Sequence, residues 1–211
     1  MKIGPDFHVD AKLRDGTPVV VRHIRPDDAD DVRRGFAELS PESRYRRFLG
    51  GISHLSDAMV RYLTQVDGVD HVAIVAGVIT PDQKTERGIG VARFIRVEGH
   101  PHVAEAAVTV VDAWQGRGVG TLLLGYLAEA ARERDVHFFR AEMLASNEPM
   151  RTLAEHMGAV IERADGETLV IDVALDPLPH EDESPLRRMF RSAASSVMVF
   201  LARILPLGHR D

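Results

Sequence analysis

A glycine-rich turn between an apolar strand and a leucine-rich helix is the feature that most restricts the fold of this 211-residue chain. The apolar run 104–111 has the character of a strand, the turn follows at 115–120, and the helix carries Leu122, Leu123 and Leu127. A strand that leads into such a helix indicates a sheet with helices packed on it. The chain is therefore expected to be an α/β (α+β) protein.

The glycine-rich turn also suits an anion. Several backbone N–H groups at the start of a helix favour phosphate oxygens. The spacing matches neither a dinucleotide fingerprint, which would need a glycine where Thr121 stands, nor a P-loop with its Lys-Ser/Thr pair. The alternative is that the glycines only make a tight strand-to-helix turn.

Composition excludes several other classes of function. The 26 Lys and Arg against 32 Asp and Glu give a formal charge of −6, which argues against a nucleic-acid partner. The chain has no cysteine, so disulfides, thiolate zinc sites and a cysteine nucleophile are excluded. The N-terminal residues show no apolar signal region, and we expect a cytoplasmic protein.

The remaining elements are expected at regular intervals along the chain. Asp15-Gly16 predicts a hairpin within 7–24, and Ser40-Pro41 predicts a helix start. The expected helices are 27–39, 40–49, 56–66, the leucine-rich helix and 149–157, and the further strands are 72–79, 88–97, 137–143, 160–161 and 169–171.

A change of composition at 176–179 indicates a domain boundary. We expect one domain over 1–175, a linker at 176–185 and an amphipathic basic C-terminal helix at 186–207. Arg191 and Arg203 interrupt its apolar stripe too much for a spanning helix. The helix is expected to dock on its own core, to pair in a homodimer, or to make a peripheral membrane contact.

The residues 108–120 and the helix after them resemble the acetyl-CoA signature of the GNAT acetyltransferases, Gln/Arg-x-x-Gly-x-Gly/Ala. Gln115, Gly118 and Gly120 occupy its three fixed places. The order of elements from about 18 to 173 is similar to the whole GNAT fold, a mixed and mostly antiparallel central sheet flanked by helices. Segments 21–28 and 39–48 are similar to the bacterial protein-lysine acetyltransferases in particular.

The resemblance implies acetyl-CoA as cosubstrate and direct transfer of the acetyl group to an amine. The pyrophosphate would lie on the turn, the pantetheine arm would pair with the strand that ends at Val111, and an amide near Val111 would polarise the thioester carbonyl. The residues expected to bind the cofactor are Val110, Val111, Gln115, Gly116, Arg117, Gly118, Val119, Gly120, Thr121 and Asn147. Asn147 could equally be only a helix N-cap.

Glu105 is the expected catalytic base, because the resemblance places a glutamate at this position of the strand. By period two it shares a face with Ala107, Thr109 and Val111. The alternative is an ordinary solvated glutamate at a strand start. The general-acid tyrosine of the family is missing, since Ala154 stands in its place. This leaves protonation of the thiolate to solvent or another group, for which Ser146 is a weak candidate.

The expected acceptor is a protein lysine. The alternatives are a small-molecule amine such as a polyamine or aminoglycoside, or a non-catalytic regulatory acyl-CoA-binding protein. Arg44, Tyr45, Arg46 and Arg47 would flank the acceptor entrance and contact an acidic substrate or the 3′-phosphate, or form a solvated face. No metal site is expected, because the pair His100-x-His102 stands alone without cysteine or an HExxH helix.

Overall fold

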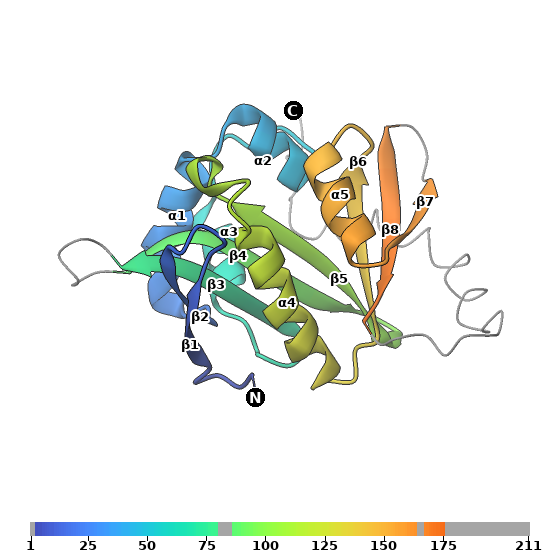
Figure 1. Ribbon diagram of the computed structural model, residues 1–211, viewed down its shortest axis with the longest axis horizontal. Helices are drawn as coiled ribbons and strands as arrows, with labels where there is room; N and C mark the ends of the chain where they lie inside the picture. The colour runs from blue at the N-terminus through green and yellow to red at the C-terminus, as the bar shows by residue number, and fades with distance from the viewer. Residues whose placement is uncertain (1–2, 80–85, 164–166, 176–211) are drawn as a thin grey trace, which may run out of the picture. The chain divides into compact units, whose positions relative to one another are not determined.

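The computed structural model describes residues 3–79, 86–163 and 167–175 (Figure 1). The expected linker at 176–185 and the expected amphipathic helix at 186–207 lie outside these residues and stay predictions. In the described part of the chain, no helix is long and apolar enough to cross a membrane.

Eight strands and five α-helices make up the described chain. The strands are β1 (His8–Lys12), β2 (Pro18–His23), β3 (His71–Ile79), β4 (Glu86–Val97), β5 (His100–Val110), β6 (Phe138–Leu144), β7 (Val160–Arg163) and β8 (Thr168–Ala174). The helices are α1 (Ala29–Ala37), α2 (Pro41–Phe48), α3 (Asp57–Thr64), α4 (Val119–Arg132) and α5 (Glu148–His156), with short 3-10 turns at Pro26–Asp28 and Asp112–Trp114.

The sheet has the order β1-β2-β3-β4-β5-β6-β8-β7, and it confirms the expected mixed, mostly antiparallel architecture. Every neighbouring pair is antiparallel except β5 and β6, which run parallel because α4 connects them. Their ladder is short and ends at the pair Glu105–Arg140. Beyond that pair the two strands diverge, as Figure 1 shows, and the sheet opens.

Helix α4 covers one face of the sheet and supplies the main core. Leu123 and Leu127 are fully buried and belong to one cluster with Ile74, Phe94 and Ile171 from the strands. On the opposite face, Ile24, Ala73 and Val75 form a smaller cluster, against which Val32 of α1 and Val66 after α3 pack. Helix α2 reaches β5 and β6 where they separate. The opening in the sheet therefore has helices on both sides.

The expected capping residues begin their helices. The Ser43 amide donates to Ser40 Oγ at 3.1 Å and the Met59 amide to Ser56 Oγ at 3.2 Å. Strand β5 begins earlier than expected, at His100, because Gly99 with φ 78° closes a tight turn that brings it back beside β4. The sequence pattern did not show this pairing because His100-Pro101-His102 is polar.

Gly90 on β4 provides a test of how closely α4 packs on the sheet. A Cβ at Gly90 would lie 3.1 Å from the Thr109 carbonyl oxygen and 3.1 Å from Leu123 Cδ1. We expect Gly90→Ala to lower the free energy of unfolding by about 1–3 kcal/mol in urea titrations, because the backbone oxygen cannot move aside. Gly125→Ala is the control, since nothing lies within 4 Å of that position in α4, and it is expected to gain up to about 1 kcal/mol. Equal effects would contradict the close packing.

Candidate active site

A groove of about 470 Å³ lies where β5 and β6 separate. The edge of β5 lines one side and residues 141–143 of β6 line the other, and the glycine-rich turn, the start of α4, helix α5 and part of α2 also contribute. Most of the expected cofactor residues line it: Val110, Gln115, Gly116, Gly118, Val119, Gly120, Thr121 and Asn147. Residues that are distant in the sequence thus meet at one opening, as the resemblance implied.

The turn owes its shape to two glycines in the left-handed region. Gly116 has φ 73° and Gly118 has φ 89°, conformations that side-chain-bearing residues adopt at a cost. Gly118 is the N-cap of α4, and its carbonyl accepts the Leu122 amide at 3.0 Å. The amides of the first turn of α4 have no partner within the helix. They are available to an anion at the positive end of the helix dipole.

Gln115 ties the turn to its surroundings. Its Nε2 lies 3.1 Å from the Val110 carbonyl oxygen, 3.2 Å from Asp112 Oδ1 and 3.3 Å from Ser43 Oγ. The Ser40 amide also donates to Asp112 Oδ2 at 3.2 Å. These contacts join the end of β5, the turn and the start of α2. In this structure the side chain of Gln115 therefore holds the groove in shape.

Arg117 is the expected cofactor residue whose side chain points elsewhere. Its Nε donates to Asp15 Oδ2 at 2.8 Å, and its guanidinium stacks on Trp114 at 4.3 Å from the ring centroid. Hydrogen bonds from Thr17, followed by one from Arg117, lower the pKa of Asp15 to about 2. Arg117 is absent from the groove lining among the described residues. Its side chain links the turn to the β1–β2 hairpin, and sequence spacing gave no sign of this pairing.

The edge of β5 refines the expectation for Val111. The Val111 amide donates to the Ile89 carbonyl at 3.0 Å, so it is already used in pairing with β4. Neighbouring residues of a strand point their amides to opposite sides, which directs the amides of Val108 and Val110 toward β6. Beyond Glu105 no ladder with β6 exists in the described chain. The amide near Val111 that faces the groove is therefore that of Val110.

Glu105 lies at the point where β5 and β6 part. It is partly buried, and it stands opposite Ile95 on β4 and Arg140 on β6. Burial raises the pKa of Glu105, and Glu142 raises it further, while Arg140 opposes the shift. Glu105 is not itself in the groove lining, but Ala106 and Ala107, which follow it, are. A carboxylate with a raised pKa thus lies next to the inner end of the groove.

Arg140 is a residue near the site that the sequence analysis missed. It makes a bidentate pair with Asp172 on β8, with Nε and Nη2 both 2.9 Å from the carboxylate oxygens, and its side chain is 6% exposed. Glu105, Arg140 and Asp172 form one row across β5, β6 and β8. Only the register of three strands reveals this row, because the residues are far apart in the sequence.

Asn147 and Ala154 lie on α5. Asn147 is the N-cap, and its Oδ1 accepts the Met150 amide at 3.3 Å. The residue also lines the groove, so the cap contact does not remove it from the space where the cofactor is expected. Ala154 is 1% exposed and belongs to the core. It offers no hydroxyl at the position of the family's tyrosine. Ser146 is not part of the groove lining in the described chain.

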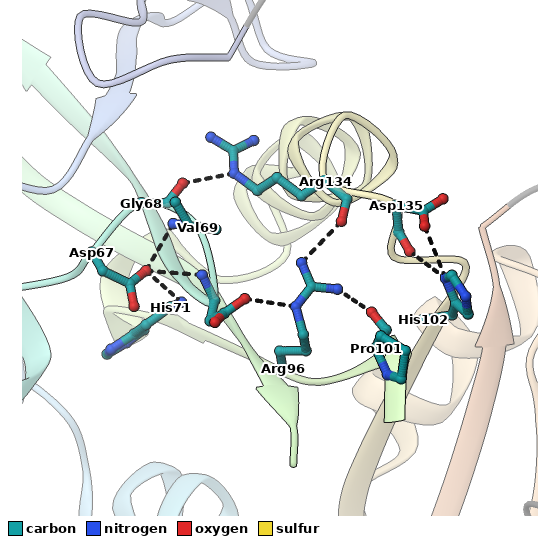
Figure 2. Close-up of polar contacts among 10 residues, drawn as sticks. Asp67, Gly68, Val69, His71, Arg96, Pro101, His102, Arg134 and Asp135 are labelled. Carbon is teal, nitrogen blue, oxygen red and sulfur yellow. Dashed lines mark hydrogen bonds and ion pairs between the residues drawn. The ribbon is translucent and has the colours of Figure 1, made fainter. Parts of the chain in front are cut away.

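His102 lies next to Asp135 and His137 in the structure, which the sequence spacing of His100 and His102 did not indicate. Figure 2 shows His102 against Asp135, with Nδ1 2.9 Å from the Asp135 carbonyl oxygen and 3.2 Å from Oδ2. His137 Nε2 lies 3.0 Å from the other carboxylate oxygen. These three residues are near enough to share one metal ion. The three side chains are solvent-accessible, and none of them lines the groove.

His71 lies on the face of the sheet opposite α4. Figure 2 shows its amide at Asp67, whose Oδ1 accepts the amides of Val69, Asp70 and His71 at 2.7–2.9 Å. The imidazole Nε2 accepts from Arg93 Nη1 at 3.1 Å. Burial, together with the charge of Arg93, lowers the pKa of His71 from 6.5 to about 4. The folded protein therefore keeps this ring neutral.

The neutral His71 predicts an acid-dependent loss of stability. Below pH 6.5 the unfolded chain binds a proton that the folded chain refuses, so stability falls between pH 6.5 and about 4. We expect this group to contribute about 2–3 kcal/mol to that fall, measured by urea unfolding across the range. His71→Gln should flatten the profile by that amount, while exposed His8→Gln should leave it unchanged. A variant profile parallel to that of the wild type would contradict the assignment.

Comparison with known proteins identifies one matching family model and two related acetyltransferases. A family model described as the acetyltransferase (GNAT) domain matches residues 19–160. The chain is 35% identical over 183 residues to acetyltransferase Pat of Mycolicibacterium smegmatis, which covers 83% of this chain and 52% of Pat. It is 33% identical over 162 residues to an acetyltransferase of Pseudomonas aeruginosa, which covers 75% of this chain and 84% of that protein. The chain thus spans about half the length of Pat.

Solved structures agree with these matches. The GNAT domain of S. lividans PAT superposes with a TM-score of 0.72 at 32% identity, covering 79% of this chain and 96% of that one. A putative acetyltransferase of Salmonella typhimurium, solved with its cofactor acetyl-CoA, gives a TM-score of 0.57 at 17% identity and covers 79% of this chain and 99% of that one. The second likeness bears on the fold alone.

Proposed function

This chain belongs to the GNAT acetyltransferase family and is an N-acetyltransferase, and from that premise we propose that it transfers the acetyl group of acetyl-CoA to the ε-amine of a protein lysine. One observation carries the proposal. The groove between β5 and β6 has the glycine-rich turn on its wall and partly buried Glu105 beside its inner end.

The groove suits a ligand with phosphate groups. The start of α4, with its unpaired N-terminal amides, lines a space that Arg14 and Arg46 also line, and Glu142 is the one carboxylate in the described lining. Amide donors together with guanidinium groups favour phosphate oxygens. The edge amides of Val108 and Val110 suit an extended amide-bearing arm laid along β5 as an added strand. These residues would hold acetyl-CoA, which supplies an acetyl group activated as a thioester.

The remaining chemistry belongs to residues of the chain. A lysine ammonium is almost wholly protonated at neutral pH, so an acceptor amine must lose a proton before it attacks. Glu105, with its raised pKa, would accept that proton directly or through water. The amide of Val110 would stabilise the oxyanion that develops on the carbonyl. The proton for the leaving thiolate would come from solvent, because Ala154 has no hydroxyl.

The choice of acceptor rests on similarity. Segments 21–28 and 39–48 are similar to protein-lysine acetyltransferases, and the chain is related to Pat. A polyamine or aminoglycoside acceptor is the alternative for the same chemistry. Assays with protein, polyamine and aminoglycoside acceptors distinguish them, and tight acetyl-CoA binding without transfer to any acceptor would favour a regulatory acyl-CoA-binding protein.

Replacing Glu105 tests the proposed base. Glu105→Gln should keep the acetyl-CoA dissociation constant within about twofold and lower kcat/KM by about 10²–10⁴, because only proton removal is lost. In the wild type, activity should fall as the pH drops through the raised pKa of Glu105, and this acid limb should vanish in the variant. Glu129→Gln, an exposed change on α4, is the control. Full activity of Glu105→Gln would exclude the base assignment.

Replacing Gly118 tests the proposed phosphate site. Gly118→Glu should weaken acetyl-CoA binding by about tenfold or more in calorimetric titrations, since it puts a side chain and a negative charge at the turn. Gly99→Glu is the matched control, because Gly99 has a similar φ of 78° but lies in the β4–β5 turn. If the two variants lost affinity equally, backbone strain would explain the loss and the phosphate site would be wrong.

A further inference from the structure

A second cavity, of about 100 Å³, lies under α1 and α2 and next to the groove. Apolar side chains such as Phe36, Phe48 and Leu63 form most of its wall. Thr109 of β5 and Val111, the residue after this strand, also line it, and strand alternation puts them on the same face as Glu105. The cavity therefore lies on the face of the sheet where an amine would approach the proposed base.

Three arginines line this cavity, namely Arg22 on β2, Arg47 on α2 and Arg93 on β4, and the last two differ from Arg22 in their partners. Burial lowers the pKa of Arg47 to about 10 and that of Arg93 to about 9, and the charge of Arg47 contributes to the shift of Arg93. The two cations are therefore near enough to repel each other. Arg47 lines the groove as well as the cavity, so it lies where the two spaces meet.

Neither guanidinium is paired with a carboxylate among the described residues. Arg93 donates to His71 Nε2 and to the Leu63 carbonyl, both at 3.1 Å and both neutral. Arg47 has only a cation–π contact with Phe48, at 5.0 Å from the ring centroid. Arg93 is buried and Arg47 is partly buried. Holding like charges there without a counter-ion is unfavourable, which indicates a site completed by an anionic ligand.

The carboxylates of the same cavity are already engaged. Asp28 makes a bidentate pair with Arg22 at 2.8 and 2.9 Å, and Glu86 lies 2.9 Å from Arg22 Nε. Asp31 pairs with Arg34 at 2.7 Å. These three acids are therefore engaged by Arg22 and Arg34, whereas Arg47 and Arg93 have no carboxylate partner among the described residues.

We propose that Arg47 and Arg93 bind a carboxylate of the acceptor, so that the enzyme prefers a lysine with an acidic side chain next to it. This inference rests on the proposed function. A guanidinium pair is suited to a carboxylate, and the cavity has the volume of about three waters, enough for the end of one acidic side chain. The carboxylate would also offset the repulsion between these cations and an approaching lysine ammonium.

A carboxylate could instead come from the acyl group, as in a dicarboxylic acyl-CoA. The acceptor is the better source, because the cavity shares the face of Glu105 while the proposed cofactor amides lie along the edge of β5. The phosphates of the cofactor have their own donors at the turn. The experiment below separates the two sources.

The test compares lysine peptides that differ only in the residue beside the acceptor, Glu or the isosteric Gln. We expect wild-type kcat/KM to be about tenfold or more higher for the acidic peptide, and Arg47→Met to abolish this preference. Arg61→Met, an exposed change on α3 outside both cavities, should keep it. Equal rates for the two peptides in the wild type, with acetyl transfer proceeding, would overturn the inference and leave the proposed function standing.

Two further measurements distinguish failure of this inference from failure of acetyl transfer, and an acceptor carboxylate from one on the acyl group. Calorimetric binding of the same peptides in the acetylated form should show the same dependence on Glu and Arg47, and it needs no turnover, so it decides the inference even if transfer fails. Succinyl-CoA replaces acetyl-CoA in the other arm. A preference for succinyl-CoA that Arg47→Met removes would assign the site to the acyl group and overturn the acceptor assignment.

Discussion

The short parallel ladder between β5 and β6 is the constraint on which the rest of the site depends. It holds only from Val103–Phe138 to Glu105–Arg140, and there the sheet opens. If the ladder continued, the edge amides of β5 would pair with β6 and no groove would exist. If it ended earlier, Glu105 would lose the strand beside it. The bidentate pair of Arg140 with Asp172 secures β6 to β8 at this same point.

The pair between Arg140 and Asp172 has a chemical consequence as well. A buried arginine facing a glutamate would normally lower the pKa of that glutamate strongly. Asp172 takes both bidentate contacts of Arg140, and burial then outweighs the remaining attraction so that the pKa of Glu105 is raised. The two acids on the row thus have different roles, one neutralising the cation and the other left with a shifted pKa.

Local signals in the sequence predicted much of the fold. Asp15-Gly16, Ser40-Pro41 and the glycine-rich turn each impose a backbone conformation through their own chemistry, so the hairpin, α2 and the start of α4 follow from a few neighbouring residues. The period of two in β5 predicts that Glu105 shares a face with Thr109 and Val111. The resemblance to a family then supplied the order of the strands, which propensity alone does not determine.

The parts that the sequence did not predict depend on register between distant strands. Arg117 was expected at the cofactor, but its ion pair joins residues 102 positions apart. Arg93 and Arg47 share a cavity only because β4 and α2 pack on the same face. No pattern within β4 or α2 indicates that the two arginines lie near each other, because arginine side chains are ordinarily solvated.

The contacts of Gln115 suggest how the two halves of the site depend on each other. This one side chain bridges the end of β5, the glycine-rich turn and Ser43 of α2, the helix that also carries Arg47. A ligand that orders the turn would also order the start of α2, since these contacts must form together. The donor groove and the acceptor cavity would then be shaped by the same hydrogen bonds, and a glutamine at this position would serve both substrates without being a catalytic residue.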